Sequence, residues 1–456
     1  MDCGSSVLPE ARNINALEEA VWRRACAWAR VEFVAVLERL DLTLMEERPE
    51  QLRNAGFRER TLVTRVGELR FRRRCYRDAE TGKYRHLLDE ALELAPRVRL
   101  SDGLVADGVA LAAEHSFRQS AGLLDFRVSH TTLHVRLQRA GAALRREVET
   151  RRHQVFSLGR RVTGTVQRVA TLFCEADGVI IRMQRETRKL VEAKLAIIYE
   201  GWERLHPSSS EYRLRSKLAY ASFQGAKAFW ESLSVLAGQR WDLSAVKVIG
   251  GDGADWIKQG LGYFAGAAYQ LCRFHLARKI RDCLGGGQAF QRVYDVRNRP
   301  GRLLVEARDA VAAALDPEQE ERARVLLDYL VANRDGLDDY RRRLEPGGLE
   351  LRGLGGIESN VDKLISNRMK KRGMAWRLDG ARNMLAVITL RANGQLRSSG
   401  EANSDLPIRE PAPPGPPGRP RRRVSPGLRS VHMPGLDSGR PLARLLRPFT
   451  KVYPPV

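Results

Sequence analysis

The sequence lacks the features of a membrane protein and of a disulfide-stabilised or zinc-finger protein. Its six cysteines are scattered over 456 residues without a repeated C-x-x-C pair, which argues against a disulfide framework and a structural zinc finger. No apolar stretch is long enough to cross a bilayer, and no basic flank followed by an apolar run opens the chain. We therefore expect a cytoplasmic protein with no membrane partner.

Acidic residues are also in short supply. The chain has 55 Asp and Glu against 78 Lys and Arg, which gives a formal net charge of +23 and a pI of about 10.3. A chain this basic favours a polyanionic partner, and nucleic acid is the leading one. Hydrophobic residues make up 43% of the sequence, enough for a real core, and the length predicts two or three folded units.

The first hundred residues, 1–100, predict a long helix and a hairpin. Apolar residues recur at helical spacing from about Ile14 to Met45, and residues 61–76 alternate around a glycine as a hairpin does. One face of this hairpin carries Arg70, Arg72 and Arg74. That row fits contact with DNA phosphates, and it fits a solvated edge strand protected by charge equally well.

Residues 101–150 predict three short helices arranged as a helix-turn-helix unit. Ser129 is placed to cap the last helix, and Gly122 to Ser129 would form the turn. The helix beginning near His130 would then read the major groove, with Arg136 and Arg139 as DNA contacts.

From residue 160 onward the pattern changes to strands. Residues 166–173, 179–183 and 195–199 read as three strands, followed by a helix over 224–236 and two strands at 246–249 and 267–271. This order predicts an α/β fold with a ribonuclease-H-like mixed sheet as its core, by analogy of element order. We assign 160–283 to the first part of the core, 284–350 to a helical insertion, 351–396 to the last core helix and 397–456 to a disordered tail rich in Pro and Arg.

Three acids stand in contexts that suit metal chemistry. Asp177 and Asp252 follow apolar runs, and Glu358 opens a basic segment. Each alone also fits a structural role, as a turn residue or as an acid at a helix start. Together they predict ligands for Mg²⁺ or Mn²⁺, with two ions in the site. Glu175 lies on the same strand face as Asp177 and is its rival for the first metal position.

Two further groups lie near these acids in the predicted fold. Cys272 and His275 are three residues apart just after the last predicted strand, where His275 either supports the metals or is a buried, satisfied histidine. The segment after Glu358 is basic and is expected to grip phosphates and stack on a base. Its predicted contacts are Arg368, Lys370, Lys371, Arg372 and Trp376.

Several short strings, in order along the chain, resemble those of bacterial insertion-sequence transposases of the ISLre type, a DDE group related to the Mutator-like transposases. They are Glu175-Ala176-Asp177, Ile198-Tyr199-Glu200-Gly201, Gly251-Asp252-Gly253-Ala254, Phe274-His275-Leu276, Glu358-Ser359-Asn360, Gly373-Met374-Ala375-Trp376 and Asn393-Gly394. The resemblance spans roughly residues 60–396. The chain departs from that family at Gly178, where an acid is common, and in its long tail.

The resemblance implies a ribonuclease-H-like core that cuts and rejoins DNA at the ends of a mobile element. It makes Asp177, Asp252 and Glu358 the catalytic triad, and Cys272 and His275 resemble a C-x-x-H signature of related transposases. The expected partners are double-stranded DNA, as terminal inverted repeats and target, and further copies of the chain in a synaptic dimer or larger assembly. The expected location is the cytoplasm, on the nucleoid. Two alternatives are a nuclease without strand transfer and a DNA-binding protein derived from an inactive transposase.

Overall fold

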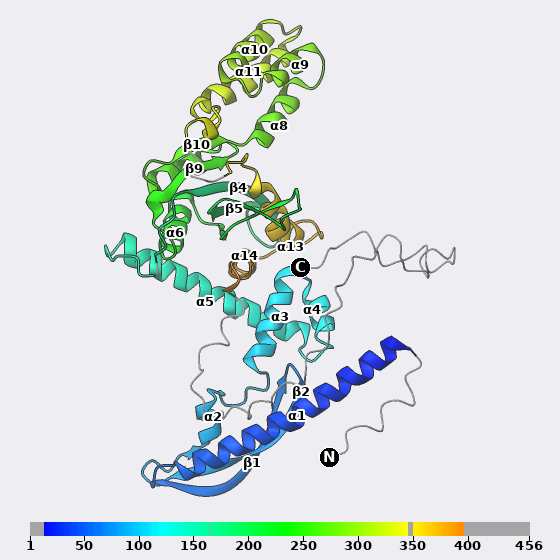
Figure 1. Ribbon diagram of the computed structural model, residues 1–456, viewed down its shortest axis with the longest axis vertical. Helices are drawn as coiled ribbons and strands as arrows, with labels where there is room; N and C mark the ends of the chain where they lie inside the picture. The colour runs from blue at the N-terminus through cyan, green and yellow to red at the C-terminus, as the bar shows by residue number, and fades with distance from the viewer. Residues whose placement is uncertain (1–12, 165, 345–349, 396–456) are drawn as a thin grey trace, which may run out of the picture. The chain divides into compact units, whose positions relative to one another are not determined.

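The computed structural model describes residues 13–164, 166–344 and 350–395, all of which belong to one compact unit, Met1–Ala402 (Figure 1). The predicted tail, 397–456, lies outside the described residues. Within the described ranges, no helix has both the length and the apolar character needed to span a bilayer.

The N-terminal elements are a long helix and a small antiparallel sheet, as predicted. Helix α1 (Ile14–Glu46) begins at Asn13, whose side chain accepts a hydrogen bond from the Ala16 N–H. Strands β1 (Leu52–Thr64), β2 (Gly67–Asp78) and β3 (Tyr84–Arg85) form the sheet. Leu37 of α1 belongs to the same buried cluster as Leu62 and Phe71 of the hairpin, so burial of apolar side chains joins the two.

Four helices follow, of which the last is much longer than the sequence pattern predicts. They are α2 (Leu87–Ala91), α3 (Asp102–Glu114), α4 (Phe117–Leu123) and α5 (His130–Phe156). Ser129 caps α5 through a hydrogen bond from the Thr132 N–H, as expected. The prediction of three short helices is wrong for α5, which runs for 27 residues because its second half packs against the core helices α6 and α14.

The core is a five-stranded mixed sheet. Its strands are β4 (Leu172–Arg182), β5 (Leu190–Tyr199), β8 (Leu218–Ser222), β9 (Val246–Gly251) and β10 (Ala268–Leu271). The spatial order is β10-β9-β4-β5-β8, with β4 in the centre. Strands β4, β5 and β8 are antiparallel neighbours, whereas β9 and β10 run parallel to β4.

Two predicted strand assignments are wrong. The predicted strand 166–173 coincides with β4 only at residues 172 and 173, and the predicted strand 179–183 covers the end of β4. Strand β4 continues through Asp177 and Gly178 because β5 pairs with it from Phe173 to Arg182. The third antiparallel strand is β8, at 218–222, which the sequence pattern did not reveal. A separate two-stranded ribbon, β6 (Trp202–Arg204) and β7 (Tyr212–Leu214), lies between β5 and β8 in sequence.

Helices cover both faces of the sheet (Figure 1). One apolar cluster joins one face to α6 (Ala226–Gly238) and to the helices after β10, and the other joins the opposite face to α3, α5 and the C-terminal helices. The helices after β10 are α8 (Arg273–Leu284), α9 (Gln288–Asp295), α10 (Pro300–Ala312) and α11 (Pro317–Ala332). The C-terminal helical segments are α12 (Gly356–Asn360), the π-helix η5 (Val361–Ser366), α13 (Asn367–Met369) and α14 (Leu378–Ala392).

Short helical turns complete the described fold. Two of them, α7 (Asp255–Lys258) and η2 (Gln259–Tyr263), follow β9, and η1 (Leu243–Ala245) precedes it. The turns η3 (Arg334–Gly336) and η4 (Tyr340–Arg342) follow α11.

Candidate metal centre

Asp177 lies in the middle of the central strand, on the face that carries Val179 and Ile181 and that the C-terminal helices cover. Its side chain is buried, at 7% exposure, and its Oδ1 accepts a hydrogen bond of 2.7 Å from the Gly178 N–H. Burial, and then the nearby Glu358 carboxylate, raise the pKa of Asp177 to about 7. Asp177 is therefore a buried carboxylate poised to exchange its proton for a cation.

Asp252 is held in a tight turn directly after β9. Its Oδ1 accepts a hydrogen bond of 2.8 Å from the Ala254 N–H, and the intervening Gly253 has a φ of +105°, which favours glycine. The Tyr329 hydroxyl donates to the Asp252 carbonyl at 2.7 Å. These bonds tie the turn to α11 and fix where the Asp252 carboxylate points.

Cys272 and His275 enter the site at the start of α8. The Cys272 N–H donates to the Gly251 carbonyl at 2.7 Å, so the end of β9 and the start of α8 are joined directly beside Asp252. Cys272 is the residue before α8, and His275 lies in its first turn.

Glu358 is positioned by another acid, Glu175. The Glu175 carboxylate, in a side chain only 2% exposed, accepts hydrogen bonds from the Tyr199 hydroxyl at 2.6 Å and from the N–H groups of Gly356 and Ile357 at 3.2 and 3.3 Å. Burial raises the pKa of Glu175, while these hydrogen bonds act to lower it. Because its oxygens hold the start of α12, Glu175 anchors the helix that carries Glu358. We therefore no longer consider Glu175 an alternative to Asp177 as a metal ligand.

The predicted acids meet around His275. Donor atoms of Asp177, Asp252 and His275 all lie within 4.8 Å of one another, and so do those of Cys272, His275 and Glu358. The His275 Nδ1 lies 3.0 Å from Glu358 Oε1. Burial acts to lower the pKa of His275, but its contacts with Cys272, Glu358 and Asp177 outweigh that effect and raise the pKa to about 10. The positive charge of the His275 imidazolium thus partly offsets the negative charge of the three carboxylates.

The residues fit a divalent cation. The His275 Nδ1 is buried and has no aligned hydrogen-bond partner among the described residues, although an Oε1 atom of Glu358 is close. A buried nitrogen without an aligned partner, beside carboxylate oxygens from separate segments, is typical of a metal-ligand set. Asp177, Asp252 and Glu358 supply the oxygen donors that Mg²⁺ and Mn²⁺ prefer.

The hairpin arginines predicted to contact DNA do not form one uniform row. Arg70 is exposed and pairs with Glu68 at 2.8 Å, and Arg72 is exposed with its guanidinium 4.8 Å from the Phe57 ring centre. Arg74 is largely buried and forms a 2.7 Å ion pair with the buried Asp41 of α1. Arg74 therefore neutralises a buried acid, and only Arg70 and Arg72 stay available to a partner.

The other predicted DNA contacts also divide into two groups. Arg139 is exposed and Arg136 half-buried on α5, and Lys370, Lys371 and Arg372 are exposed after α13, with Lys371 paired to Asp362. Arg368 is 2% exposed, donates to the Ala112 carbonyl at 2.8 Å, and has its pKa lowered to about 10 by burial. Trp376 is half-buried and donates to the Met369 carbonyl at 2.9 Å.

Arg368 and Trp376 therefore hold the protein's own chain together. The guanidinium of Arg368 lies 5.2 Å from the Trp376 ring centre, so the two side chains pack on each other. We correct the expectation that Arg368 contacts DNA, because its donors face the backbone of α3, and we do not rely on Trp376 for base stacking.

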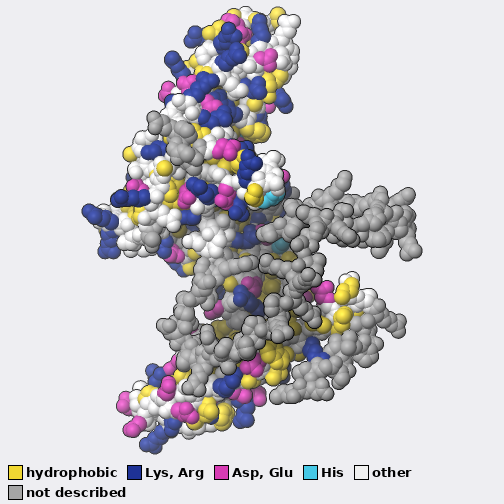
Figure 2. All heavy atoms as spheres, in the orientation of Figure 1, with side chains coloured by type: hydrophobic (Ala, Val, Ile, Leu, Met, Phe, Trp, Pro, Cys, Tyr) yellow, Lys and Arg dark blue, Asp and Glu magenta, His cyan; other side chains and the backbone are white. Residues whose placement is uncertain are grey.

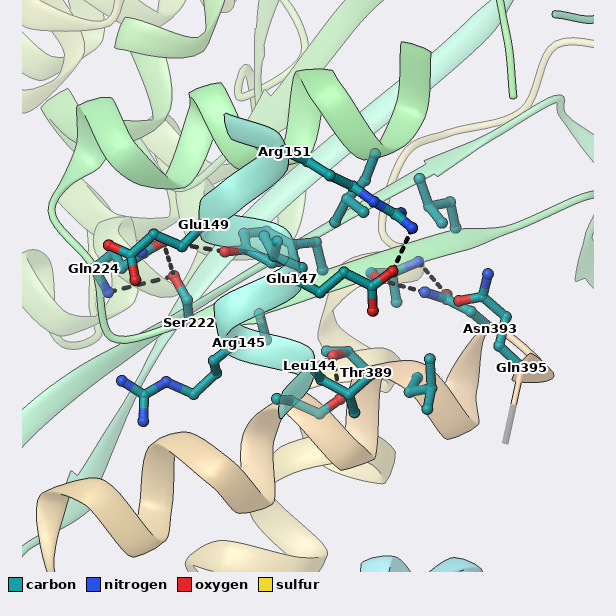
Figure 3. Close-up of a pocket in the computed structure, with 18 of the residues that line it drawn as sticks. Leu144, Arg145, Glu147, Glu149, Arg151, Ser222, Gln224, Thr389, Asn393 and Gln395 are labelled. Atoms are coloured by element: carbon teal, nitrogen blue, oxygen red, sulfur yellow. Dashed lines mark hydrogen bonds and ion pairs between the residues drawn. The ribbon is translucent and has the colours of Figure 1, made fainter. Parts of the chain in front are cut away.

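A pocket of about 610 Å³ lies between α5, β8, α6 and α14, and none of Asp177, Asp252 and Glu358 lines it (Figure 3). At its wall, the Asn393 side chain accepts from the Ala219 N–H at 2.7 Å and donates to the Ala219 carbonyl at 2.9 Å. Asn393 thus takes the place of a neighbouring strand at the edge of the sheet. No local pattern around Asn393 predicts this role. Neither Asp177 nor His275 lines this pocket.

The fold and the site define a mixed α/β protein with a candidate metal centre at its central strand. The chain belongs to the family described as "Uncharacterised protein family (UPF0236)", whose profile matches residues 8–405. A UPF0236 protein of Caldanaerobacter subterraneus subsp. tengcongensis is 21% identical over 405 residues, which cover 86% of this chain and 81% of the relative.

A second relative comes from another organism. The "UPF0236 protein in vanSb 3'region" of Streptococcus gallolyticus is 25% identical over 411 residues, covering 85% of each chain. The name of the Caldanaerobacter relative joins eleven loci of one organism.

Proposed function

We propose that this chain is a DDE transposase that binds the ends of a mobile DNA element and catalyses metal-dependent cleavage and strand transfer. The observation that carries the proposal is the meeting of Asp177, Asp252 and Glu358 around His275. These acids come from segments up to 181 residues apart in sequence, as the Glu175–Gly356 hydrogen bond beside them illustrates. Like charges gathered in a partly buried site are costly, which favours a functional reason for their presence.

The sheet order supports the same proposal. Read from β8, the strands lie in the order β8-β5-β4-β9-β10, with the first three antiparallel and the last two parallel to the central strand. This is the arrangement expected for a ribonuclease-H-like core. Asp177 on the central strand and Asp252 after the adjacent parallel strand occupy the positions expected for the first two acids of such a core.

The side chains of the site have different roles in the proposed reaction. Asp177, Asp252 and Glu358 would hold the divalent cations, and Glu175 keeps Glu358 in place through α12. Bound Mg²⁺ supplies activation of the attacking oxygen and stabilisation of the leaving oxygen in displacement at phosphorus. His275, with its pKa raised to about 10, is a cation near the acids that can also orient a phosphate oxygen or the Glu358 carboxylate.

The charge of the chain supports DNA as the substrate. The net charge is +23, and Figure 2 shows Lys and Arg side chains spread widely over the visible face, interleaved with acidic ones. We propose the exposed Arg70, Arg72, Arg139, Lys370 and Arg372 as phosphate contacts. DNA affinity should then fall steeply with salt, because each neutralised phosphate releases counterions. An affinity that barely changes with salt would count against DNA as the partner.

The comparisons supply a further argument. The printed name of the Caldanaerobacter relative joins eleven labels of one organism, and we interpret this as many copies of one gene. Many copies of one gene in a genome are what a self-propagating DNA element leaves behind. We propose that the present chain, like this relative, is encoded by a self-propagating DNA element.

The test uses DNA that flanks the reading frame in its genome, with inverted repeats as the candidate ends. Purified protein and Mg²⁺ should nick or cut these ends, and Asp252→Ala should abolish cleavage while retaining DNA binding. Asp242→Ala is the matched control, because Asp242 is also a turn acid whose Oδ1 accepts a backbone N–H two residues on, but it lies outside the cluster. Equal activity of the Asp252 variant and the unchanged protein would contradict the proposal.

The products separate this proposal from its alternatives. A transposase joins the freed 3′-hydroxyl ends to target DNA, so joined products are expected. Cleavage without joined products would favour a nuclease, and binding without cleavage would favour an inactive, transposase-derived DNA-binding protein.

A further inference from the structure

A second donor set lies within the acid cluster, and its chemistry differs from that of the oxygen ligands. The Cys272 Sγ, the His275 Nδ1 or Nε2 and a Glu358 carboxylate oxygen all lie within 4.8 Å of one another. Sulfur and imidazole nitrogen are poor ligands for Mg²⁺ but good ligands for Zn²⁺ and related thiophilic ions. The fold brings Glu358 to Cys272 and His275 from 86 residues beyond Cys272.

We propose that Cys272, His275 and Glu358 form a binding site for a thiophilic divalent cation, with Zn²⁺ as its natural occupant. The proposal requires only the geometry of these three side chains and does not depend on the transposase function.

The distances already match a zinc ligand set. Bonds of about 2.3 Å to sulfur and about 2.0 Å to nitrogen and oxygen place tetrahedral ligands about 3.5 Å apart for sulfur and oxygen and about 3.3 Å apart for nitrogen and oxygen. The Cys272 Sγ lies 3.7 Å and the His275 Nδ1 3.0 Å from the same atom, Glu358 Oε1. Only small side-chain movements are needed for all three to reach one ion.

The surroundings also suit a bound ion. The Cys272 side chain is buried at 5% exposure, while the side chains of His275 and Glu358 are 20% and 29% exposed, so the site opens to solvent on one side. Three protein ligands with one side open is the pattern of zinc sites that keep a position for water or a substrate. The start of α8 is fixed to β9 by the 2.7 Å bond from the Cys272 N–H to the Gly251 carbonyl, which holds the thiol in place.

The site overlaps the oxygen ligand set through Glu358 and His275. A zinc ion held by Cys272, His275 and Glu358 would occupy the Glu358 carboxylate that the oxygen ligand set also needs. Zn²⁺ is therefore expected to compete with Mg²⁺ for Glu358.

The test uses Cd²⁺ as a spectroscopic probe of the full chain, because a cadmium–thiolate bond gives a charge-transfer band in the ultraviolet. One equivalent of Cd²⁺ should produce the band, Zn²⁺ should abolish it, and about a thousandfold excess of Mg²⁺ should not. Cys272→Ser should remove the band, and Glu358→Gln should weaken Cd²⁺ binding by at least about tenfold. Cys283→Ser is the matched control, because Cys283 is a buried cysteine near the end of α8 and outside the cluster.

Three results would overturn the site. They are the absence of the band in the unchanged protein, its persistence in Cys272→Ser, and its equal loss in Cys283→Ser. Circular dichroism of each variant checks that the helices are retained, and Glu358→Gln changes a partly exposed side chain, so it tests the site without disturbing the core. Because no step measures DNA cleavage, the outcome is independent of the proposed function.

Discussion

The N-terminal hairpin and the five-stranded sheet use buried charge in opposite ways. In the hairpin region, the buried Arg60 pairs with Asp89 at 2.5 Å, Arg73 pairs with the same acid at 2.8 Å, and Arg74 pairs with Asp41 at 2.7 Å. In the sheet, Asp177, Asp252 and Glu358 gather around a single His275. Paired charges hold the first region together, whereas the second contains more negative charge than its own cation balances.

This difference separates structural charges from candidate functional ones. A buried ion pair satisfies itself, and removing one partner leaves the other unpaired in a poorly solvated place. A cluster of like charges raises the pKa of its members, as it does for Asp177, and is relieved by a cation or a proton from outside.

Replacing Asp89 should strongly destabilise the hairpin region. Asp89→Ala leaves the guanidinium of Arg60, whose side chain is 6% exposed, without its carboxylate. We expect a loss of about 3–5 kcal/mol in the free energy of unfolding, measured by urea denaturation. Asp107→Ala is the control, since its pair with Arg65 is well exposed and should contribute less than about 1 kcal/mol. Similar losses in both variants would remove the contrast between buried and exposed pairs.

Replacing Glu175 should loosen the segment that carries Glu358. Glu175→Ala leaves the Tyr199 hydroxyl and two N–H groups of α12 without acceptors, at a cost of about 2–3 kcal/mol. Amide hydrogen exchange at Gly356 and Ile357 should accelerate, and Glu175→Gln, which keeps an acceptor oxygen, should restore part of the protection. Unchanged exchange in Glu175→Ala would show that α12 does not need this anchor.

Replacing Asp177 should stabilise the metal-free protein at alkaline pH. The pKa of Asp177 is raised in the folded state to about 7, so ionisation above that pH costs the folded chain more than the unfolded chain. Asp177→Asn should therefore gain about 1–3 kcal/mol at about pH 8, with the gain fading as the pH falls toward 4. Thermal unfolding in the presence of a chelator measures this, and a destabilised variant at pH 8 would contradict it.

Metal affinity should depend on pH through the same group. Below about pH 7 a proton competes with the cation for Asp177, so Mn²⁺ affinity should fall about tenfold for each unit of pH lost. Isothermal titration calorimetry at several pH values checks this slope, and Asp177→Asn should flatten it. A slope that continues above pH 8 would show that His275, with its pKa raised to about 10, also gives up its proton to the metal.

Some helices and strands could be predicted from the sequence more accurately than others. The helix from Ile14 and the hairpin were predicted correctly because their periodicity is long and regular. Strand β4 was divided at Asp177-Gly178, a typical turn pair, since the sequence does not show that β5 and β9 pair with the strand on both sides. Strand β8 was missed because its five residues become an edge strand only through β5 and the Asn393 side chain.

The arginines illustrate the same limit. Nothing near Arg74 or Arg368 in sequence distinguishes them from exposed cations. Arg74 meets Asp41, 33 residues away, and Arg368 meets the Ala112 carbonyl, 256 residues away. Burial of a charged side chain depends on such distant partners, which local composition does not encode.

Composition and local pattern establish which chemical groups this protein has. These are its strong positive charge, its acids in distinct local settings, and the Cys272–His275 spacing at the start of a helix. The role of each carboxylate depends on the folded arrangement. Glu175 and Asp177 lie two residues apart on one strand face, yet Glu175 meets the N–H groups of α12 while Asp177 meets Asp252 and His275. The two roles differ because the role of a buried carboxylate is set by the donors, charges and ions that other segments bring to it.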